Sequence, residues 1–143
     1  MTVGIVDLFC GVGGLTCGLR QAGLNVVAGI DLDSDCKYPY EHNNKSTFIN
    51  KNIMEVKGNE ILNLLENFDT KILVGCAPCQ PFSNHQKKKK ERSKHKDWKL
   101  LYEFSRIVSE CMPDIVSMEN VPELREEKVF DDFVTNLVKL GYY

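Results

Sequence analysis

The regular alternation of apolar runs with amphipathic stretches is the feature that most constrains the fold of this chain. Short runs rich in β-branched residues are typical of strands, and they occupy residues 3–9, 25–30, 47–53, 71–75 and 114–118. Apolar residues recur at helical spacing in a stretch that ends at Ala22 and in residues 60–68, 100–111 and 129–140. Strands that alternate with helices predict a doubly wound α/β fold, in which helices cover both faces of a mostly parallel sheet.

Residues of the kinds that bind ligands stand where the predicted strands end. They occupy residues 10–14, 31–33, 52, 76–83 and 119–121. In an open parallel sheet, ligands bind beyond the carboxyl ends of the strands. We therefore expect these segments to form one site at that edge of the sheet.

A glycine-rich turn, Phe9-Cys10-Gly11-Val12-Gly13-Gly14, joins the first predicted strand to the first helix. Glycines at this place let the backbone approach a ligand at a helix N-terminus. A dinucleotide site would have a glycine three residues after Gly13, where this chain has Thr16. The turn therefore points away from a nicotinamide or flavin dinucleotide.

Asp31 closes the second predicted strand, where a carboxylate can accept hydrogen bonds from ribose hydroxyls. Asp33 and Asp35 follow it and would repel an anionic ligand. A zwitterionic nucleoside that carries a sulfonium fits this turn better. The alternative is a glycine-rich turn followed by an acidic helix cap, with no ligand.

A cysteine stands on a stiff segment after the fourth predicted strand. Cys79 lies between Pro78 and Pro81, and proline continues neither a strand nor a helix, so the segment suits a thiol aimed at a substrate. Cys76-x-x-Cys79 could instead be half of a zinc site, although no second pair has suitable spacing. It could also be a redox pair, although it opens no helix here.

Glu119 ends the fifth predicted strand, in the sequence Met-Glu-Asn-Val at residues 118–121. A carboxylate that emerges from an apolar strand is costly to bury unless it is paired or used. The functional interpretation is a carboxyl group that takes part in a site at this strand end. The alternative is a surface or helix-capping glutamate.

Length and composition exclude several classes of protein. The 143 residues, 43% of them hydrophobic, suffice for one domain with a core. A membrane span would need a run of about 18 apolar residues, and the chain has none. The N-terminus lacks the pattern of a secretory signal. We therefore expect an intracellular protein whose six cysteines are reduced thiols, most of them buried.

The charge is concentrated in one segment. Residues 87–96 carry seven Lys or Arg and one Glu, a local charge of +6, which leaves −8 for the rest of a chain whose total is −2. An acidic body with one basic segment suggests a partner that presents phosphates at one place. A solvated loop is the alternative.

Three segments together resemble the ordered motifs of the cytosine-C5 DNA methyltransferase family. They are residues 7–19 (DLFCGVGGLTCGL), 75–83 (GCAPCQPFS) and 118–121 (MENV). The similarity runs from about residue 3 to the C-terminus. It implies the Rossmann-like, doubly wound, mostly parallel sheet of an S-adenosylmethionine-dependent methyltransferase, incomplete at the C-terminal end.

The resemblance implies covalent catalysis on a cytosine that has left its base stack. Cys79 matches the nucleophile that adds to C6. Glu119 matches the carboxyl group that contacts N3 and the exocyclic amine. The residues that match the S-adenosylmethionine site are Phe9, Cys10, Gly11, Val12, Gly14, Asp31, Leu32, Asn52, Ile53 and Pro78.

The chain departs from the family pattern at two positions. Asn52 stands where the family has an aspartate at the adenine edge, so we expect weaker cofactor binding. Cys76 stands where the family often has glycine. The resemblance also implies that the segment after Cys79 closes over nucleic acid, with phosphate contacts from Ser83, Lys87, Lys88, Lys89, Lys90, Arg92, Lys94 and Lys96.

The family's later motifs, including its recognition region, have no counterpart in residues 1–143. We therefore expect this chain to be the cofactor-binding catalytic domain of a longer polypeptide, or one subunit of a split enzyme, and to be inactive alone. The resemblance implies that the partner is double-stranded DNA and that the protein has no metal site. It also implies a bacterial restriction-modification system in the cytoplasm. A tRNA cytosine-C5 methyltransferase and a non-enzymatic module remain as alternatives.

Overall fold

A single parallel sheet organises the chain. The structure, a computed structural model, describes residues 1–78 and 98–143. The sheet has five parallel strands in the order β3-β2-β1-β4-β5. They are β1 Val3–Leu8, β2 Val26–Asp31, β3 Thr47–Asn50, β4 Thr70–Gly75 and β5 Ile115–Met118. The order reverses between β1 and β4, which confirms the predicted doubly wound α/β fold.

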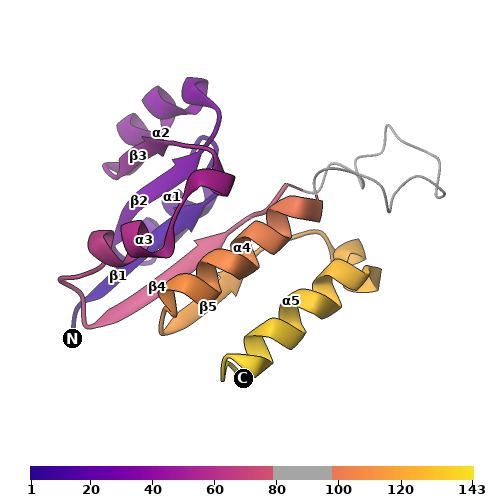
Figure 1. Cartoon of the computed structure of the whole chain (residues 1–143). Helices are drawn as coiled ribbons and strands as arrows, with labels where there is room; N and C mark the ends of the chain where they lie inside the picture. Colours follow the sequence, from indigo (N-terminus) through magenta and orange to yellow (C-terminus); the bar gives the residue numbers. More distant parts are fainter. Residues whose placement is uncertain (79–97) are drawn as a thin grey trace.

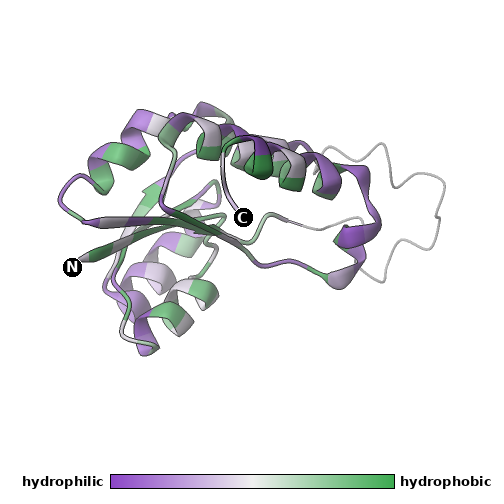
Figure 2. Cartoon of the chain, turned by 90° about the horizontal axis from the view of Figure 1, so that it is seen from below, coloured by the Kyte–Doolittle hydropathy of each residue, from purple (hydrophilic) through white to green (hydrophobic). Residues whose placement is uncertain are grey.

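Helices cover the sheet on both sides, as Figures 1 and 2 show. Helices α1 (Gly14–Gln21) and α2 (Lys37–Asn44) lie on one face. Helices α3 (Gly58–Leu64), α4 (Trp98–Cys111) and α5 (Lys128–Lys139) lie on the other. This division follows from the order of the strands, because the chain winds outward from β1 in one direction and from β4 in the other.

The core follows the alternation of side chains along the central strand. Val6 and Leu8 of β1 are fully buried in the large cluster that includes Phe104 of α4. Ile5 points to the opposite face, where Leu15 packs from α1. A strand buried on both faces reads as a continuous apolar run, which is why the sequence around β1 predicts a strand so clearly.

Helix α2 was not predicted from the sequence. Its residues are mostly polar, and Pro39 lies within it. Proline is tolerated in the first turn of a helix, where its missing N–H has no intrahelical partner. Tyr40 and Asn44, four residues apart, are the buried residues of this helix, so its apolar periodicity is too weak to detect.

The predicted bounds of the third strand and of the third helix differ most from the structure. The third strand ends at Asn50, and the predicted strand end at Ile53 is instead the start of the short 3-10 helix η2 (Ile53–Glu55). Helix α3 begins at Gly58 rather than residue 60 and ends before Leu65, whose N–H donates to Ile61 and Leu62 carbonyls. The bond to Leu62 is of the 3-10 type, which tightens the last turn of the helix.

The sheet is unevenly covered at β5. Val116 and Met118 pack against the large core cluster. Ile115 points to the other face and is 48% exposed. The expectation that helices cover both faces therefore holds at the centre of the sheet and not at this strand. Among the described residues, no helix has the length and apolar character needed to cross a membrane.

Candidate active site

The register of the sheet brings the predicted site segments to one edge. Leu8 of β1 pairs with Ile30 of β2 and with Gly75 of β4, and Gly75 pairs with Met118 of β5. Asp31 pairs with Asn50 on the far side. The residues that follow these positions therefore leave the sheet side by side, which confirms the predicted common edge for the described part of the site.

The glycine-rich turn curls tightly after β1. Phe9, Gly11 and Gly13 all have positive φ values, of 59°, 50° and 91°. An added Cβ at Gly13 would collide with the Asn44 side-chain amide of α2, so glycine is required there. At Gly11 and Gly14, no described atom outside the adjoining backbone lies within 4 Å of the place of a Cβ, which leaves room for a ligand.

Asp31 holds the turn in place. Its Oδ2 accepts a hydrogen bond of 2.8 Å from the Gly11 N–H, and its Oδ1 accepts one of 2.9 Å from the Asp33 N–H. A carboxylate can accept about four hydrogen bonds, so capacity remains for ribose hydroxyls. Asp31 is half-buried beside the open side of Gly11. The geometry fits the ribose-binding role that the resemblance implies.

The apolar residues of the predicted cofactor site divide into exposed and buried ones. Val12 is 59% exposed and Leu32 is 68% exposed, so both present apolar surface that a nucleoside could cover. Phe9 is half-buried, and its ring lies edge-on to Phe104 at 6.5 Å between centroids. Cys10 is buried, and burial raises the pKa of its thiol, which makes it an inert packing residue.

The predicted adenine-edge residues lie in the turn after β3. Ile53 is buried in the core, so little of its side chain faces solvent. Asn52 is half-buried, and its Oδ1 caps η2 by accepting a 3.0 Å hydrogen bond from the Met54 N–H. An amide oxygen accepts two hydrogen bonds, so the cap leaves one for a ligand amine.

The ends of β4 and β5 bring a thiol against a carboxylate. Cys76 Sγ donates to Glu119 Oε2 at 2.9 Å. The two backbones are joined by the Glu119 N–H, which donates to the Gly75 carbonyl at 3.1 Å, and by Asn120 Nδ2, which donates to the Ala77 carbonyl at 2.9 Å. Glu119 is therefore held beside the segment that leads to Cys79. Sequence reasoning noted Cys76 as a departure and missed this contact.

Glu119 is exposed, which corrects one step of the sequence argument. The expected cost of burying its carboxylate does not arise, because the side chain leaves the sheet at its edge. Its candidacy rests instead on the neighbouring Cys76 and on its place at the same edge of the sheet as the glycine-rich turn.

Several predicted residues lie outside the described part of the chain. They are Cys79, Ser83, Lys87, Lys88, Lys89, Lys90, Arg92, Lys94 and Lys96. Pro78 is the last residue described before them, and it is exposed. Within residues 1–78 and 98–143, no three His, Cys, Asp or Glu side chains gather as a metal site would require.

A buried polar network beneath the turn was missed by sequence reasoning. Asp7 is fully buried in β1, and its Oδ2 accepts a 2.6 Å hydrogen bond from the Thr16 hydroxyl. Thr16 in turn lies 3.1 Å from the Tyr40 hydroxyl, which lies 3.3 Å from Ser46 Oγ. The signal that could have found it is an acidic residue inside the apolar run of β1. Among the described residues, Asp7 Oδ1 has no hydrogen-bond partner.

The charge state of Asp7 makes a prediction for stability. Burial raises the pKa of Asp7 from 3.8 to about 6, against the opposing hydrogen bond from Thr16. Between about pH 4 and pH 6 the folded protein therefore keeps a proton that the unfolded chain releases, so the free energy of unfolding falls as the pH rises through this window, by about 3 kcal/mol at most.

The variant Asp7→Asn keeps the acceptor for Thr16 and carries no charge. Its free energy of unfolding relative to the natural chain should rise by roughly 2–3 kcal/mol between pH 4 and pH 7.5, measured by urea unfolding. A difference between the two proteins that does not change with pH would show that Asp7 does not titrate in this window.

Comparison with known proteins assigns the chain to a family. The family model described as C-5 cytosine-specific DNA methylase matches residues 3–143. The Type II methylase M.HgiDII of Herpetosiphon aurantiacus is 53% identical over 146 residues, which cover 100% of this chain and 40% of that protein. The Type II methyltransferase M.XorII of Xanthomonas oryzae pv. oryzae is 34% identical and covers 83% of this chain and 28% of its own length. The chain thus spans less than half of these relatives.

Solved structures share the fold. EhMeth, a methyltransferase of Entamoeba histolytica, superimposes with a TM-score of 0.75 at 23% identity over 100% of this chain and 45% of its own. The Dnmt2 methyltransferase of S. pombe superimposes with a TM-score of 0.73 at 17% identity over 100% of this chain and 42% of its own. Because the family model matches residues 3–143, the chain belongs to the C-5 cytosine-specific DNA methylase family.

Proposed function

We propose that residues 1–143 are the S-adenosylmethionine-binding catalytic domain of a DNA cytosine-C5 methyltransferase, of the kind found in bacterial restriction-modification systems. The observation that carries the proposal is the contact between Cys76 and Glu119 at the edge that also holds the glycine-rich turn. It holds the carboxylate against Cys76, which stands three residues before the cysteine of the Pro-Cys-Gln sequence, at the same edge of the sheet as a turn that suits a nucleoside.

The described residues fit the cofactor. Asp31 has acceptor capacity for a ribose, and the backbone at Gly11 is open. Val12 and Leu32 present apolar surface that an adenine would cover. The acidic Asp31 and Asp33 favour a cationic ligand over a pyrophosphate. When bound, S-adenosylmethionine supplies a methyl group on a sulfonium.

In the proposed mechanism, the Cys79 thiolate adds to C6 of a flipped cytosine, and the C5–C6 π electrons shift to C5, where they are delocalised through C4 onto N3. Glu119 hydrogen-bonds N3 and the exocyclic amine, which stabilises the charge that develops there. C5 then becomes nucleophilic and would take the methyl group that the sulfonium supplies, with the electrons of the broken carbon–sulfur bond left on a neutral thioether. Removal of the C5 proton by a base returns the electron pair to the C5–C6 bond, and Cys79 leaves. The Cys76 thiol, by donating to Glu119 Oε2, orients this carboxyl group.

The basic segment 87–96 is proposed to contact DNA phosphates, with contributions from Ser83. Each neutralised phosphate contact steepens the dependence of affinity on salt. The Type II methylases among the relatives support DNA as substrate and the bacterial cytoplasm as the place of action. Because the chain spans 40% of M.HgiDII, recognition of a target sequence is proposed to need further protein, in the same polypeptide or in a second one.

A direct assay tests the proposed function. The protein that contains residues 1–143 is incubated with S-adenosylmethionine carrying a labelled methyl group and with either duplex DNA or tRNA. The proposal expects label in 5-methylcytosine of the DNA. Label in tRNA alone would show that the protein is a tRNA cytosine-C5 methyltransferase instead. No transfer to either, together with no binding of S-adenosylmethionine, would support a module without catalysis.

Asn52 makes a specific prediction for cofactor affinity. A carboxylate in its place would accept a charge-assisted hydrogen bond from the adenine amine, and such bonds are about twice as strong as neutral ones. Asn52→Asp should therefore tighten S-adenosylmethionine binding by about 5- to 10-fold, since one oxygen can still cap Met54. Calorimetric titration measures the affinity.

The control is Asn59→Asp, which adds the same charge at an exposed residue of α3. A cationic ligand gains from any added negative charge, so the control measures that general effect. An equal gain in S-adenosylmethionine affinity in both variants would show that residue 52 does not contact the adenine.

A further inference from the structure

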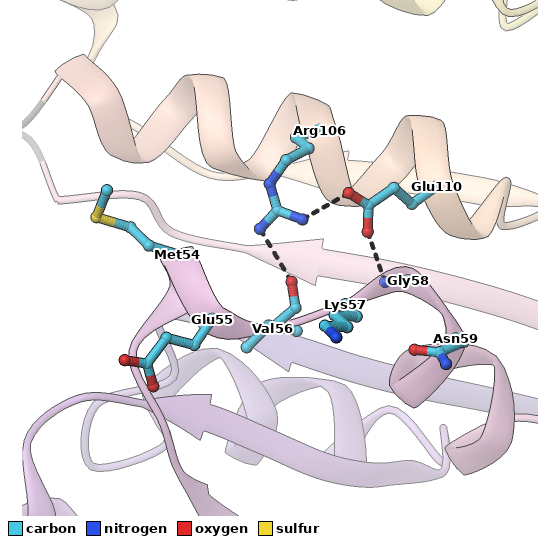
Figure 3. Close-up of a pocket in the computed structure, with 8 residues that line it drawn as sticks. All are labelled: Met54, Glu55, Val56, Lys57, Gly58, Asn59, Arg106 and Glu110. Atoms are coloured by element: carbon cyan, nitrogen blue, oxygen red, sulfur yellow. Dashed lines mark hydrogen bonds and ion pairs between the residues drawn. The ribbon is translucent and has the colours of Figure 1, made fainter.

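Arg106 of helix α4 is the centre of a hydrogen-bond cluster that holds the turn after β3. Its Nη2 donates to the carbonyl oxygens of Ile53 at 3.1 Å and Val56 at 2.9 Å. Its Nη1 donates to Glu110 Oε1 at 2.7 Å, and its Nε donates to Glu103 Oε2 at 2.7 Å. Figure 3 shows the guanidinium between the turn and Glu110.

Glu110 continues the cluster to the start of α3. Its Oε2 accepts a 2.7 Å hydrogen bond from the Gly58 N–H, so the carboxylate bridges Arg106 and Gly58. An added Cβ at Gly58 would collide with the Glu110 Cβ and lie 2.9 Å from the Cys111 N. The absent side chain thus lets the backbone of the turn lie directly on α4. The two ends of residues 53–58 are therefore both fastened to the same helix.

This cluster is more specific than a pair of surface charges. Arg106 is 32% exposed and Glu110 39% exposed, and the cluster borders an open hollow of about 570 Å³ lined also by Met54, Lys57 and Asn59. Solvent screens the ion pairs at such a place, so charge alone contributes little. What remains is geometry, because a planar guanidinium can bind two carbonyls and two carboxylates at once, which a lysine ammonium cannot.

The turn that this cluster holds includes the proposed adenine edge. Asn52 caps η2 by accepting from the Met54 N–H, and the backbone of Ile53 is bound by Arg106. The position of the Asn52 amide therefore depends on where η2 lies on α4. Neither Arg106 nor Glu110 belongs to the residues that the family resemblance assigns to the cofactor.

We propose that Arg106, with Glu110, is a positioning residue for S-adenosylmethionine: it fixes the η2 turn on α4 and thereby pre-organises the adenine edge at Asn52. The inference rests on the proposed function, since it requires a cofactor at this edge. Pre-organisation raises affinity because the ordering of the turn is completed before the ligand binds.

The test compares four variants in the protein that contains residues 1–143. Arg106→Met keeps the aliphatic stem and removes the fork, and Arg106→Lys keeps only the charge. Val108→Ala is the stability control, because it creates a cavity in the same helix at a fully buried core residue. Lys99→Met is the charge control, because it removes a cation from an exposed position of α4.

Two readouts are measured on each variant: the free energy of unfolding in urea, and the dissociation constant for S-adenosylmethionine under conditions where the variant is folded. We expect Arg106→Met to weaken cofactor binding about 10-fold and Arg106→Lys about 3- to 10-fold. We expect Val108→Ala and Lys99→Met to bind within about 2-fold of the natural protein, although Val108→Ala is less stable.

A merely structural role for Arg106 would lower stability and leave the affinity of the folded variant unchanged, and that result would overturn the inference. Equal loss of affinity in Val108→Ala would overturn it as well, because affinity would then follow stability alone. If the natural protein itself does not bind S-adenosylmethionine, the proposed function fails and the inference falls with it. That outcome can be distinguished from failure of the inference alone, because it is seen in the natural protein before any residue is substituted.

Discussion

Replacing Cys79 by serine should reduce methyl transfer to DNA by at least about 10^4-fold while leaving S-adenosylmethionine binding intact. A serine hydroxyl is not ionised near neutral pH, so it cannot add to C6 as a thiolate does. The measurement is the rate of label transfer from S-adenosylmethionine at saturating DNA, together with a cofactor titration of the same protein.

Cys76→Ser is the matched comparison, since it removes the other thiol of the Cys-x-x-Cys sequence. A serine at this position can still donate to Glu119 Oε2, so the rate should fall by less than about 10-fold. The opposite pattern, a large loss of rate in Cys76→Ser and a small one in Cys79→Ser, would show that the nucleophile is Cys76 and not Cys79.

The second large effect is expected at Glu119. Glu119→Gln should lower kcat by about 10^2- to 10^3-fold, because one preorganised group that stabilises developing charge is worth that much. KM for S-adenosylmethionine should change little, since Glu119 lies at the end of β5 and outside the proposed cofactor residues. Steady-state kinetics with each substrate varied in turn separate the two constants.

Glu123→Gln serves as the control, because Glu123 is an exposed glutamate four residues further along the chain, in the short helix η5 (Pro122–Glu126). A similar loss in both variants would point to a general effect of charge on DNA binding. An unchanged kcat in Glu119→Gln would show that this carboxyl group takes no part in the reaction.

The parts of the fold that the sequence predicts well are those encoded in local apolar patterns. β1 and β4 are buried on both faces over most of their length, so their sequences are largely apolar, and their parallel pairing follows from the helices between them. Because parallel strands of similar length end at one edge, the common location of Asp31, Cys76 and Glu119 could be predicted before any coordinates.

The parts that the sequence did not predict depend on contacts between distant side chains. Helix α2 buries two residues and is otherwise polar, so packing of Tyr40 rather than periodicity determines it. The Cys76–Glu119 contact joins residues 43 positions apart, and the link from Arg106 to Ile53 joins residues 53 apart. Such contacts follow from strand register and side-chain rotamers, which no local pattern encodes.

Asp7 shows how a local signal can be read in two ways. An acidic residue within an apolar strand is either a sign that the strand ends there or a buried group with partners. In the structure Asp7 is a buried group with a partner, because Thr16 of α1 donates to it and the Tyr40 hydroxyl of α2 lies within hydrogen-bond distance of Thr16 in turn. Helix α2 was not predicted, so the partner that completes this network could not be anticipated either.

Covalent trapping tests the central claim most directly. A duplex library that contains 5-fluorocytosine in place of cytosine is incubated with S-adenosylmethionine and the protein that contains residues 1–143. Fluorine at C5 cannot leave as the proton does, so the bond between the thiol and C6 persists after methyl transfer. The account predicts a denaturation-resistant, cofactor-dependent complex whose adduct maps by mass spectrometry to Cys79. The absence of any adduct, or an adduct on Cys76, would contradict it.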